Sequence, residues 1–330
     1  MEIIPILFYP MLATIIASVV VTAASITAVR LADKKIAHIV KIISGVIVLC
    51  GIIACIVCMS LYYANEIEPS GYYEDVNTYA MLAICIVLIA ILIVLYFFIG
   101  KKHKENDDTR TLAYGAIALA LSFALSYAKI FSLPQGGTIT FASLLPLMVY
   151  SYMFGIRRGI ALCVVYGILQ AVQDPWIIHP LQFLLDYPIA FAFIGISGMF
   201  REIGLFKKIP IVSLLLGGIV AVVGRYASHV GSGIFAFASY APEGYTAVIW
   251  GFLYNTFAFV DMAIALGAGC ILFASRTFVT QVIEKAPIGR KNIVEEDSDL
   301  EIVYDENETE DEKEELENSV MEDENTTTMD

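Results

Sequence analysis

Long apolar stretches separated by short polar segments occupy most of the chain up to residue 274. Most of these stretches approach the length of about 20 apolar residues that a helix needs to cross the hydrocarbon core of a bilayer. The pattern predicts an all-α, polytopic transmembrane helix bundle. The predicted spans are residues 3–29, 42–62, 81–100, 111–131, 139–154, 159–173, 181–200, 209–230 and 247–274.

Lys and Arg are concentrated in alternate connecting segments. They follow the first, third, fifth, seventh and ninth spans, whereas the other connections hold Asp, Glu, Gly and aromatic residues. Only Lys129 and Arg225, near predicted outer helix ends, depart from this pattern. Because basic loops stay on the cytoplasmic side, we expect a multi-pass protein of the cell membrane with its N-terminus outside and its C-terminus in the cytoplasm.

The net charge of −13 does not describe the membrane part of the chain. Residues 295–330 hold 18 of the 33 acidic residues and one of the 20 Lys and Arg, so the remainder is slightly basic. With 58% hydrophobic and 16% charged residues overall, an acidic soluble protein is excluded. The acidic, aromatic-poor end is predicted to be a disordered cytoplasmic tail.

Neither cysteine nor histidine indicates a metal site. The six cysteines all lie in apolar runs, and the Cys55-x-x-Cys58 pair has no second pair to complete a zinc site. The four histidines are dispersed, and no phosphate-binding loop of the G-x-x-x-x-G-K-[ST] type occurs. We therefore expect no catalytic residue, no metal, no cofactor and no nucleic-acid partner, and any ATP hydrolysis must take place in another protein.

Unusual polar and aromatic residues of the second half collect near the predicted outer ends of three spans. Arg225, His229 and Gly233 recur every four residues, so they share one face if their helix continues. The predicted topology places further residues in the same outer layer: Asp186, Tyr187, Phe237, Trp250, Tyr254 and Asn255. Ionisable residues in membrane spans usually serve function, so this layer indicates a ligand site open to the outside. The alternative is a buried hydrogen-bonded pair beneath an interfacial aromatic belt.

A carboxylate among several aromatic rings suits a flat cationic ligand, through charge pairing and cation–π attraction. His229 and Asn255 can add directional hydrogen bonds to ring nitrogens or an exocyclic amine. Arg225 would repel a cation, so we expect it to pair with Asp186, with backbone carbonyls or with a phosphate edge of the ligand.

Residues 111–283 resemble the thiamine-specific substrate-binding subunit of energy-coupling-factor vitamin transporters, a six-helix membrane protein. The resemblance rests on four places: the stripe Ala116, Ala120 and Ala124; the loop from Leu133 to Thr138; Gln182-x-x-x-Asp186-Tyr187-Pro188; and Arg225-Tyr226-x-x-His229-x-x-x-Gly233 with Ser239-Tyr240-Ala241-Pro242 and Tyr254-Asn255. It implies three extra transmembrane helices in residues 1–105, a six-helix core in 106–285 and the tail in 286–330.

The resemblance also implies the function and its residues. Thiamine would be captured from outside and delivered for ATP-driven uptake by a partner module of one transmembrane coupling subunit and two ATPase subunits. Ala116, Ala120 and Ala124 would meet the coupling subunit, although ordinary packing within the bundle explains such a stripe equally well. The implied substrate-binding residues are Gln135, Asp186, Tyr187, His229, Gly233, Phe237, Trp250 and Asn255.

Three alternatives stay open at this point. The chain could bind another vitamin or a thiamine precursor. It could be an ion-coupled secondary transporter that uses Asp186 and His229 as a proton relay. A membrane-embedded enzyme is disfavoured because no serine near His229 has the context of a nucleophile.

Overall fold

The computed structural model describes residues 43, 76–100, 109–206, 209–284 and 286. The predicted first span, the second span apart from residue 43, the acidic tail and three of the cysteines lie outside the described residues. Four described helices are long and apolar enough to cross a membrane: Thr78–Phe98, Ile156–Gln173, Pro210–Phe235 and Ala247–Ala274. Shorter apolar helices accompany them, so the prediction of a multi-pass helical membrane protein is confirmed. The number of helices before Thr109 stays a prediction.

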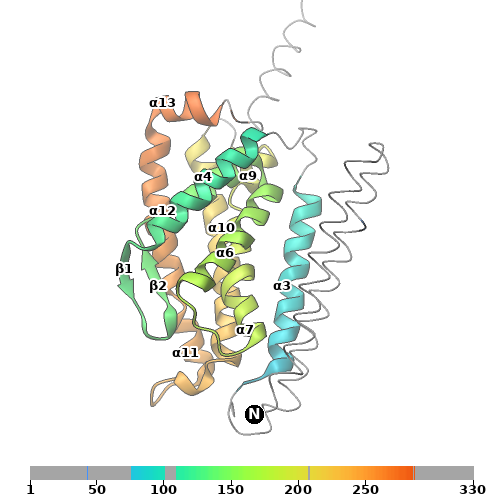
Figure 1. The fold of residues 1–330 in the computed structure, drawn as a ribbon, viewed down its shortest axis with the longest axis vertical. Helices are drawn as coiled ribbons and strands as arrows, with labels where there is room; N and C mark the ends of the chain where they lie inside the picture. The colour runs from blue at the N-terminus through green and yellow to red at the C-terminus, as the bar shows by residue number, and fades with distance from the viewer. Residues whose placement is uncertain (1–42, 44–75, 101–108, 207–208, 285, 287–330) are drawn as a thin grey trace, which may run out of the picture. The chain divides into compact units, whose positions relative to one another are not determined.

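The elements follow one another mostly as helices (Figure 1). In chain order they are α3 (Thr78–Phe98), α4 (Thr109–Ser126), β1 (Lys129–Ser132), η3 (Pro134–Gly136), β2 (Thr138–Thr140), α5 (Leu145–Phe154), α6 (Ile156–Gln173), α7 (Pro180–Leu184), η4 (Leu185–Ile189), α8 (Ala190–Ile194), α9 (Met199–Glu202), α10 (Pro210–Phe235), η5 (Ala238–Tyr240), α11 (Ala247–Tyr254) and α12 (Phe257–Ala274). A second unit begins at Ser275 and contains α13 (Arg276–Phe278) and η6 (Val279–Ile283).

A two-stranded hairpin lies where the end of one predicted span and the beginning of the next were expected to be helical. The spans 111–131 and 139–154 were expected to be helical throughout, but α4 ends at Ser126 and α5 begins at Leu145. Between them β1 pairs antiparallel with β2. The segment is rich in β-branched and aromatic residues, which favour strands. Pro134, Gln135 at φ 60° and Gly136 at φ 88° form the turn that reverses the chain.

The predicted span 181–200 is a broken helix. Between α7 and α8 the backbone widens into the π-helical turn η4, which contains Pro188. Proline has no N–H to donate to the carbonyl four residues earlier, and its ring clashes with that carbonyl, so the helix cannot continue as a regular α-helix there. The widened turn is where Asp186 and Tyr187 lie, at the pocket described below.

Glycines let the central helices approach closely at the turn that follows α8. A Cβ on Gly217 of α10 would lie 1.8 Å from the backbone oxygen of Ser197, and one on Gly159 of α6 would lie 2.5 Å from that of Gly195. These distances leave no room for any side chain larger than hydrogen. The close approach brings α10, which carries Arg225 and His229, next to the broken helix that carries Asp186.

Helix α3 packs on the side of the bundle formed by α7 and α10, although it precedes the predicted six-helix core (Figure 1). At its start the Asn77 N–H donates to Phe235 O at 2.9 Å, and Thr78 Oγ1 lies 2.9 Å from His179 Nε2. His179 Nδ1 accepts the Leu181 N–H at 3.1 Å and so caps α7. Burial lowers the pKa of His179 to about 4, so the ring is neutral near pH 7 and donates from Nε2. Helix α3 therefore supports the same helix ends that carry the pocket.

Candidate ligand-binding site

One pocket brings together all eight residues predicted to bind substrate. They come from the hairpin turn, from η4, from the last third of α10, from the connection that follows α10 and from the first part of the α11–α12 helix. The predicted residues on its wall are Gln135, Asp186, Tyr187, His229, Gly233, Phe237, Trp250 and Asn255. Helix α10 continues past Arg225 and ends at Phe235, so Arg225, His229 and Gly233 lie on one helix.

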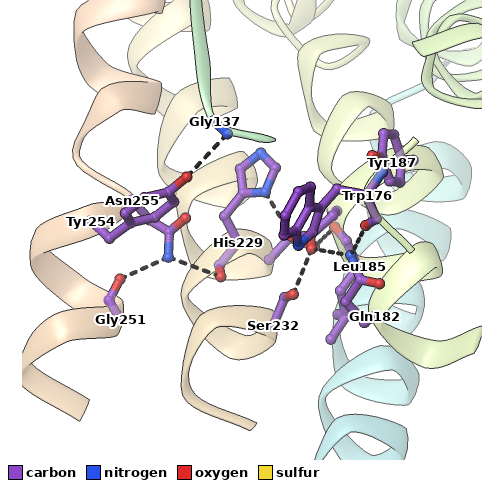
Figure 2. A network of polar contacts seen from close by, with 12 residues as sticks. Gly137, Trp176, Gln182, Leu185, Tyr187, His229, Ser232, Gly251, Tyr254 and Asn255 are labelled. Carbon is purple, nitrogen blue, oxygen red and sulfur yellow. Dashed lines mark hydrogen bonds and ion pairs between the residues drawn. The ribbon is translucent and has the colours of Figure 1, made fainter. Parts of the chain in front are cut away.

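The carboxylate of Asp186 is held by three side chains. Its Oδ1 lies 2.9 Å from His229 Nδ1, and its Oδ2 accepts from Ser232 Oγ at 2.6 Å and from Gln182 Nε2 at 2.7 Å. The side chain is 18% exposed, so it is largely buried but still lines the pocket. Figure 2 shows how His229, Ser232 and Gln182 converge at this point. The result is a negative group fixed in position before any ligand arrives.

His229 presents its second ring nitrogen without a partner. Because Asp186 is an acceptor, the proton between them belongs to His229 Nδ1, and in the neutral imidazole Nε2 carries the lone pair. Nε2 is buried and has no hydrogen-bond partner among the residues that the structure describes. The ring lies 5.5 Å from that of Phe257, centre to centre, and both residues line the pocket. In the neutral form, His229 therefore presents a hydrogen-bond acceptor to the pocket.

Asn255 is fixed by its amide protons. Its Nδ2 donates to Gly251 O at 2.7 Å and to His229 O at 3.1 Å (Figure 2). These two bonds use both protons and leave Oδ1 as the remaining polar atom, an acceptor. A Cβ on Gly233 would lie 2.8 Å from Asn255 Nδ2, so a glycine is needed for the amide to occupy this place.

Aromatic rings line much of the rest of the pocket. The rings of Trp250 and Tyr254 lie 5.8 Å apart, as do those of Phe237 and Tyr240. Trp176, from the connection between α6 and α7, is 39% exposed and belongs to the same wall. A fixed carboxylate, two hydrogen-bond acceptors and several π faces match the chemistry of a flat cationic heterocycle.

The hairpin turn closes against the pocket through Tyr254. The Tyr254 hydroxyl accepts the Gly137 N–H at 3.0 Å and donates to Pro134 O. Deeper in the structure, Thr140 of β2 donates from its backbone nitrogen and from its hydroxyl to Asp261 Oδ1, each at 2.9 Å. The turn is therefore held by a half-buried contact at its tip and by a buried contact at its base.

Arg225 has a partner that was not predicted. Its Nη1 lies 2.7 Å from Asp261 Oδ2 in an ion pair that is almost fully buried. The expectation that it pairs with Asp186 is wrong, because His229, Ser232 and Gln182 already surround that carboxylate. The signal was present in the sequence, since Asp261 is an acidic residue inside an otherwise apolar span.

Comparison with known proteins decides the family. Residues 112–281 match the thiamine transporter protein (Thia_YuaJ) family. The chain belongs to this thiamine transporter family. The resemblance noted from the sequence is confirmed, and so is a transport role in place of an enzymatic one. The family segment begins within α4, so α3 precedes it.

Two bacterial relatives are named thiamine transporters. The chain is 35% identical to the thiamine transporter ThiT of Bacillus subtilis over 153 residues, which are 43% of this chain and 78% of the relative. It is 24% identical to that of Lacticaseibacillus paracasei over 169 residues, or 47% and 80%. A solved structure of ThiT from Listeria monocytogenes has a TM-score of 0.46 at 22% identity and covers 52% of this chain and 97% of that one.

The small-residue stripe of this thiamine transporter faces outward. Ala116, Ala120 and Ala124 are all exposed on α4, whereas Gly115, Ala118 and Ser122 point into the protein. The structure therefore does not support packing within the described bundle as the reason for the stripe. A partner contact through these alanines remains a prediction.

Several residues of the pocket wall were not predicted as binding residues. Gln182 and Ser232 hold Asp186, and Tyr254 holds the hairpin turn. Their spacing could have indicated two of them, because Gln182 precedes Asp186 by one helical turn and Ser232 follows His229 by three residues. Within the described ranges no group of three or more His, Cys, Asp and Glu side chains could hold a metal ion. The expected absence of metal and cofactor stays a prediction.

Proposed function

We propose that this membrane protein binds thiamine from the outside of the cell and passes it to an ATP-driven partner module. The observation that carries the proposal is the fixed Asp186 carboxylate beside the free His229 Nε2, in a pocket lined by aromatic rings. Membership of the thiamine transporter family points to the same ligand.

Thiamine combines a positively charged thiazolium ring with an aminopyrimidine, and each part has a counterpart in the pocket. The Asp186 carboxylate offsets the positive charge, and Phe237, Trp250 and Tyr254 offer faces for the flat rings. The exocyclic amine can donate to His229 Nε2 and to Asn255 Oδ1, the acceptors that the protein leaves free. Tyr187 and Gln135 border the pocket and complete the enclosure.

Entry from outside follows from the predicted orientation, with the N-terminus outside and the C-terminus cytoplasmic. In that orientation the hairpin turn lies at the extracellular end and covers the pocket. Opening would require the Tyr254 hydroxyl to release Gly137 and Pro134, while Thr140 keeps its buried bonds to Asp261.

The proposal is tested by titrating the detergent-purified protein with thiamine. The chain has two tryptophans, Trp176 and Trp250, and both line the pocket, so their fluorescence reports on its occupation. We expect a saturable change at one thiamine per chain and no chemical turnover. Trp250→Phe should remove the part of the fluorescence change that comes from the Trp250 ring. No saturable change, or equal competition by an unrelated vitamin, contradicts thiamine as the ligand.

The exposed alanines give a separate prediction about the partner. We expect Ala120→Leu to lower thiamine uptake by cells about tenfold or more, because added bulk prevents close helix contact with a coupling subunit. Thiamine binding by the purified variant should stay unchanged, since Ala120 is not part of the pocket lining.

Ala263→Leu is the matched control, because Ala263 is likewise exposed, on α12. It should support normal uptake. If Ala120→Leu transports normally, or if uptake persists in vesicles without any ATPase, the partner proposal fails and an ion-coupled transporter becomes the better explanation.

A further inference from the structure

A positive charge stands in the wall of a pocket proposed to hold a cation. Arg225 lines the pocket together with Asp186, whereas its partner Asp261 is not part of the lining. A guanidinium group keeps its positive charge in proteins. Without compensation, Arg225 would cancel the attraction that Asp186 exerts on a cationic ligand.

The structure holds Arg225 firmly in that wall. Its guanidinium carbon lies 4.9 Å from the ring centre of Phe191 and 6.0 Å from that of Phe257. The side chain is 5% exposed, and its Nε has no hydrogen-bond acceptor within the described part of the chain. The charge cannot turn away into solvent, so it has to be balanced where it lies.

Asp261 is arranged to provide this balance. Its Oδ2 lies 2.7 Å from Arg225 Nη1, and its Oδ1 accepts from the nitrogen and from the hydroxyl of Thr140. The side chain is 3% exposed in the apolar helix α12. A buried carboxylate with this set of donors is an acceptor-only group that faces the arginine.

We propose that Asp261 is a specificity-determining residue, because it neutralises Arg225 and leaves Asp186 as the single uncompensated charge of the pocket. The other two charged residues of the lining, Lys129 and Asp174, form an ion pair of their own at 2.5 Å. The carboxylate of Asp186 is then not opposed by Arg225, which favours a positively charged ring over a neutral ring of the same shape. This inference rests on the proposed function, since it explains how the thiamine site selects its ligand.

The test compares thiamine with its neutral isostere, in which a thiophene ring replaces the thiazolium ring. The measured quantity is the ratio of the two dissociation constants, obtained for the wild-type protein and for three variants. Asp261→Asn should reduce the preference for thiamine about tenfold, because the released charge of Arg225 repels a cation in a poorly solvated site. Arg225→Gln should increase the preference by about the same factor.

The double variant Arg225→Gln/Asp261→Asn separates charge from structure. It removes both charges and keeps the net charge of the pocket, so its ratio should lie within about twofold of the wild-type ratio. Absolute affinities for both ligands fall in all three variants, because the wall and the base of the hairpin rearrange. A purely structural role would lower both affinities together and leave the ratio constant.

Equal ratios in all folded variants would overturn the proposal. If Asp261→Asn does not fold, Arg225→Gln and the double variant still decide it, because only the charge argument makes their ratios differ. Failure of the wild-type protein to bind thiamine would instead overturn the proposed function.

Discussion

Asp186→Asn should weaken thiamine binding about 100-fold, which corresponds to about 2.7 kcal/mol. The substitution keeps the size of the side chain but removes the negative charge of a carboxylate that is fixed in the pocket wall. It also disturbs the three contacts around the carboxylate, because the new amide would present a donor to Ser232, Gln182 or His229. Equilibrium titration of tryptophan fluorescence measures the effect.

Two comparisons make this result specific. Glu243→Gln removes one negative charge from an exposed loop position and should leave the affinity within about twofold, since exposed charges are screened. His229→Ala removes the free acceptor and a support of Asp186, and it should also weaken binding about tenfold or more. Normal binding by folded Asp186→Asn and His229→Ala proteins would exclude this pocket as the thiamine site.

Gly217→Ala should destabilise the protein by about 3 kcal/mol, although it adds a single methyl group. The added Cβ would lie 1.8 Å from Ser197 O and 2.7 Å from Ser197 C, so α10 and the turn after α8 must separate. Both neighbours are backbone atoms, which cannot change rotamer to make room. Thermal unfolding in detergent, followed by circular dichroism, measures the loss.

Gly267→Ala on α12 is the matched control. A Cβ at Gly267 would meet no atom within 4 Å. Because alanine is about 0.5–1 kcal/mol more favourable than glycine inside a helix, this variant should be as stable as the wild-type protein or slightly more stable. Similar melting temperatures for the two variants would show that α10 does not depend on the close approach at Gly217.

An apolar stretch of the sequence predicted a helix correctly where it contained neither a proline in its middle nor a strand-forming segment. The stretch 209–230 became α10 and the stretch 247–274 became α11 and α12. The prediction failed at residues 129–140, where hydropathy is compatible with both a helix end and a hairpin. It also failed around Pro188, where an apolar composition does not reveal that the backbone widens into a π-turn.

The sequence by itself determined the membrane class, the thiamine transporter family and the residues gathered in the pocket. Those properties follow from local composition, from short motifs and from the spacing of polar residues within apolar spans. Only the tertiary structure decided which partner each charged group has: Asp186 contacts His229, Ser232 and Gln182, whereas Arg225 pairs with Asp261. The reason is physical, because ion pairing in a buried site depends on distances of a few ångströms between helices. Those distances are set by close contacts such as that of Gly217 with Ser197, which no linear pattern of residues specifies.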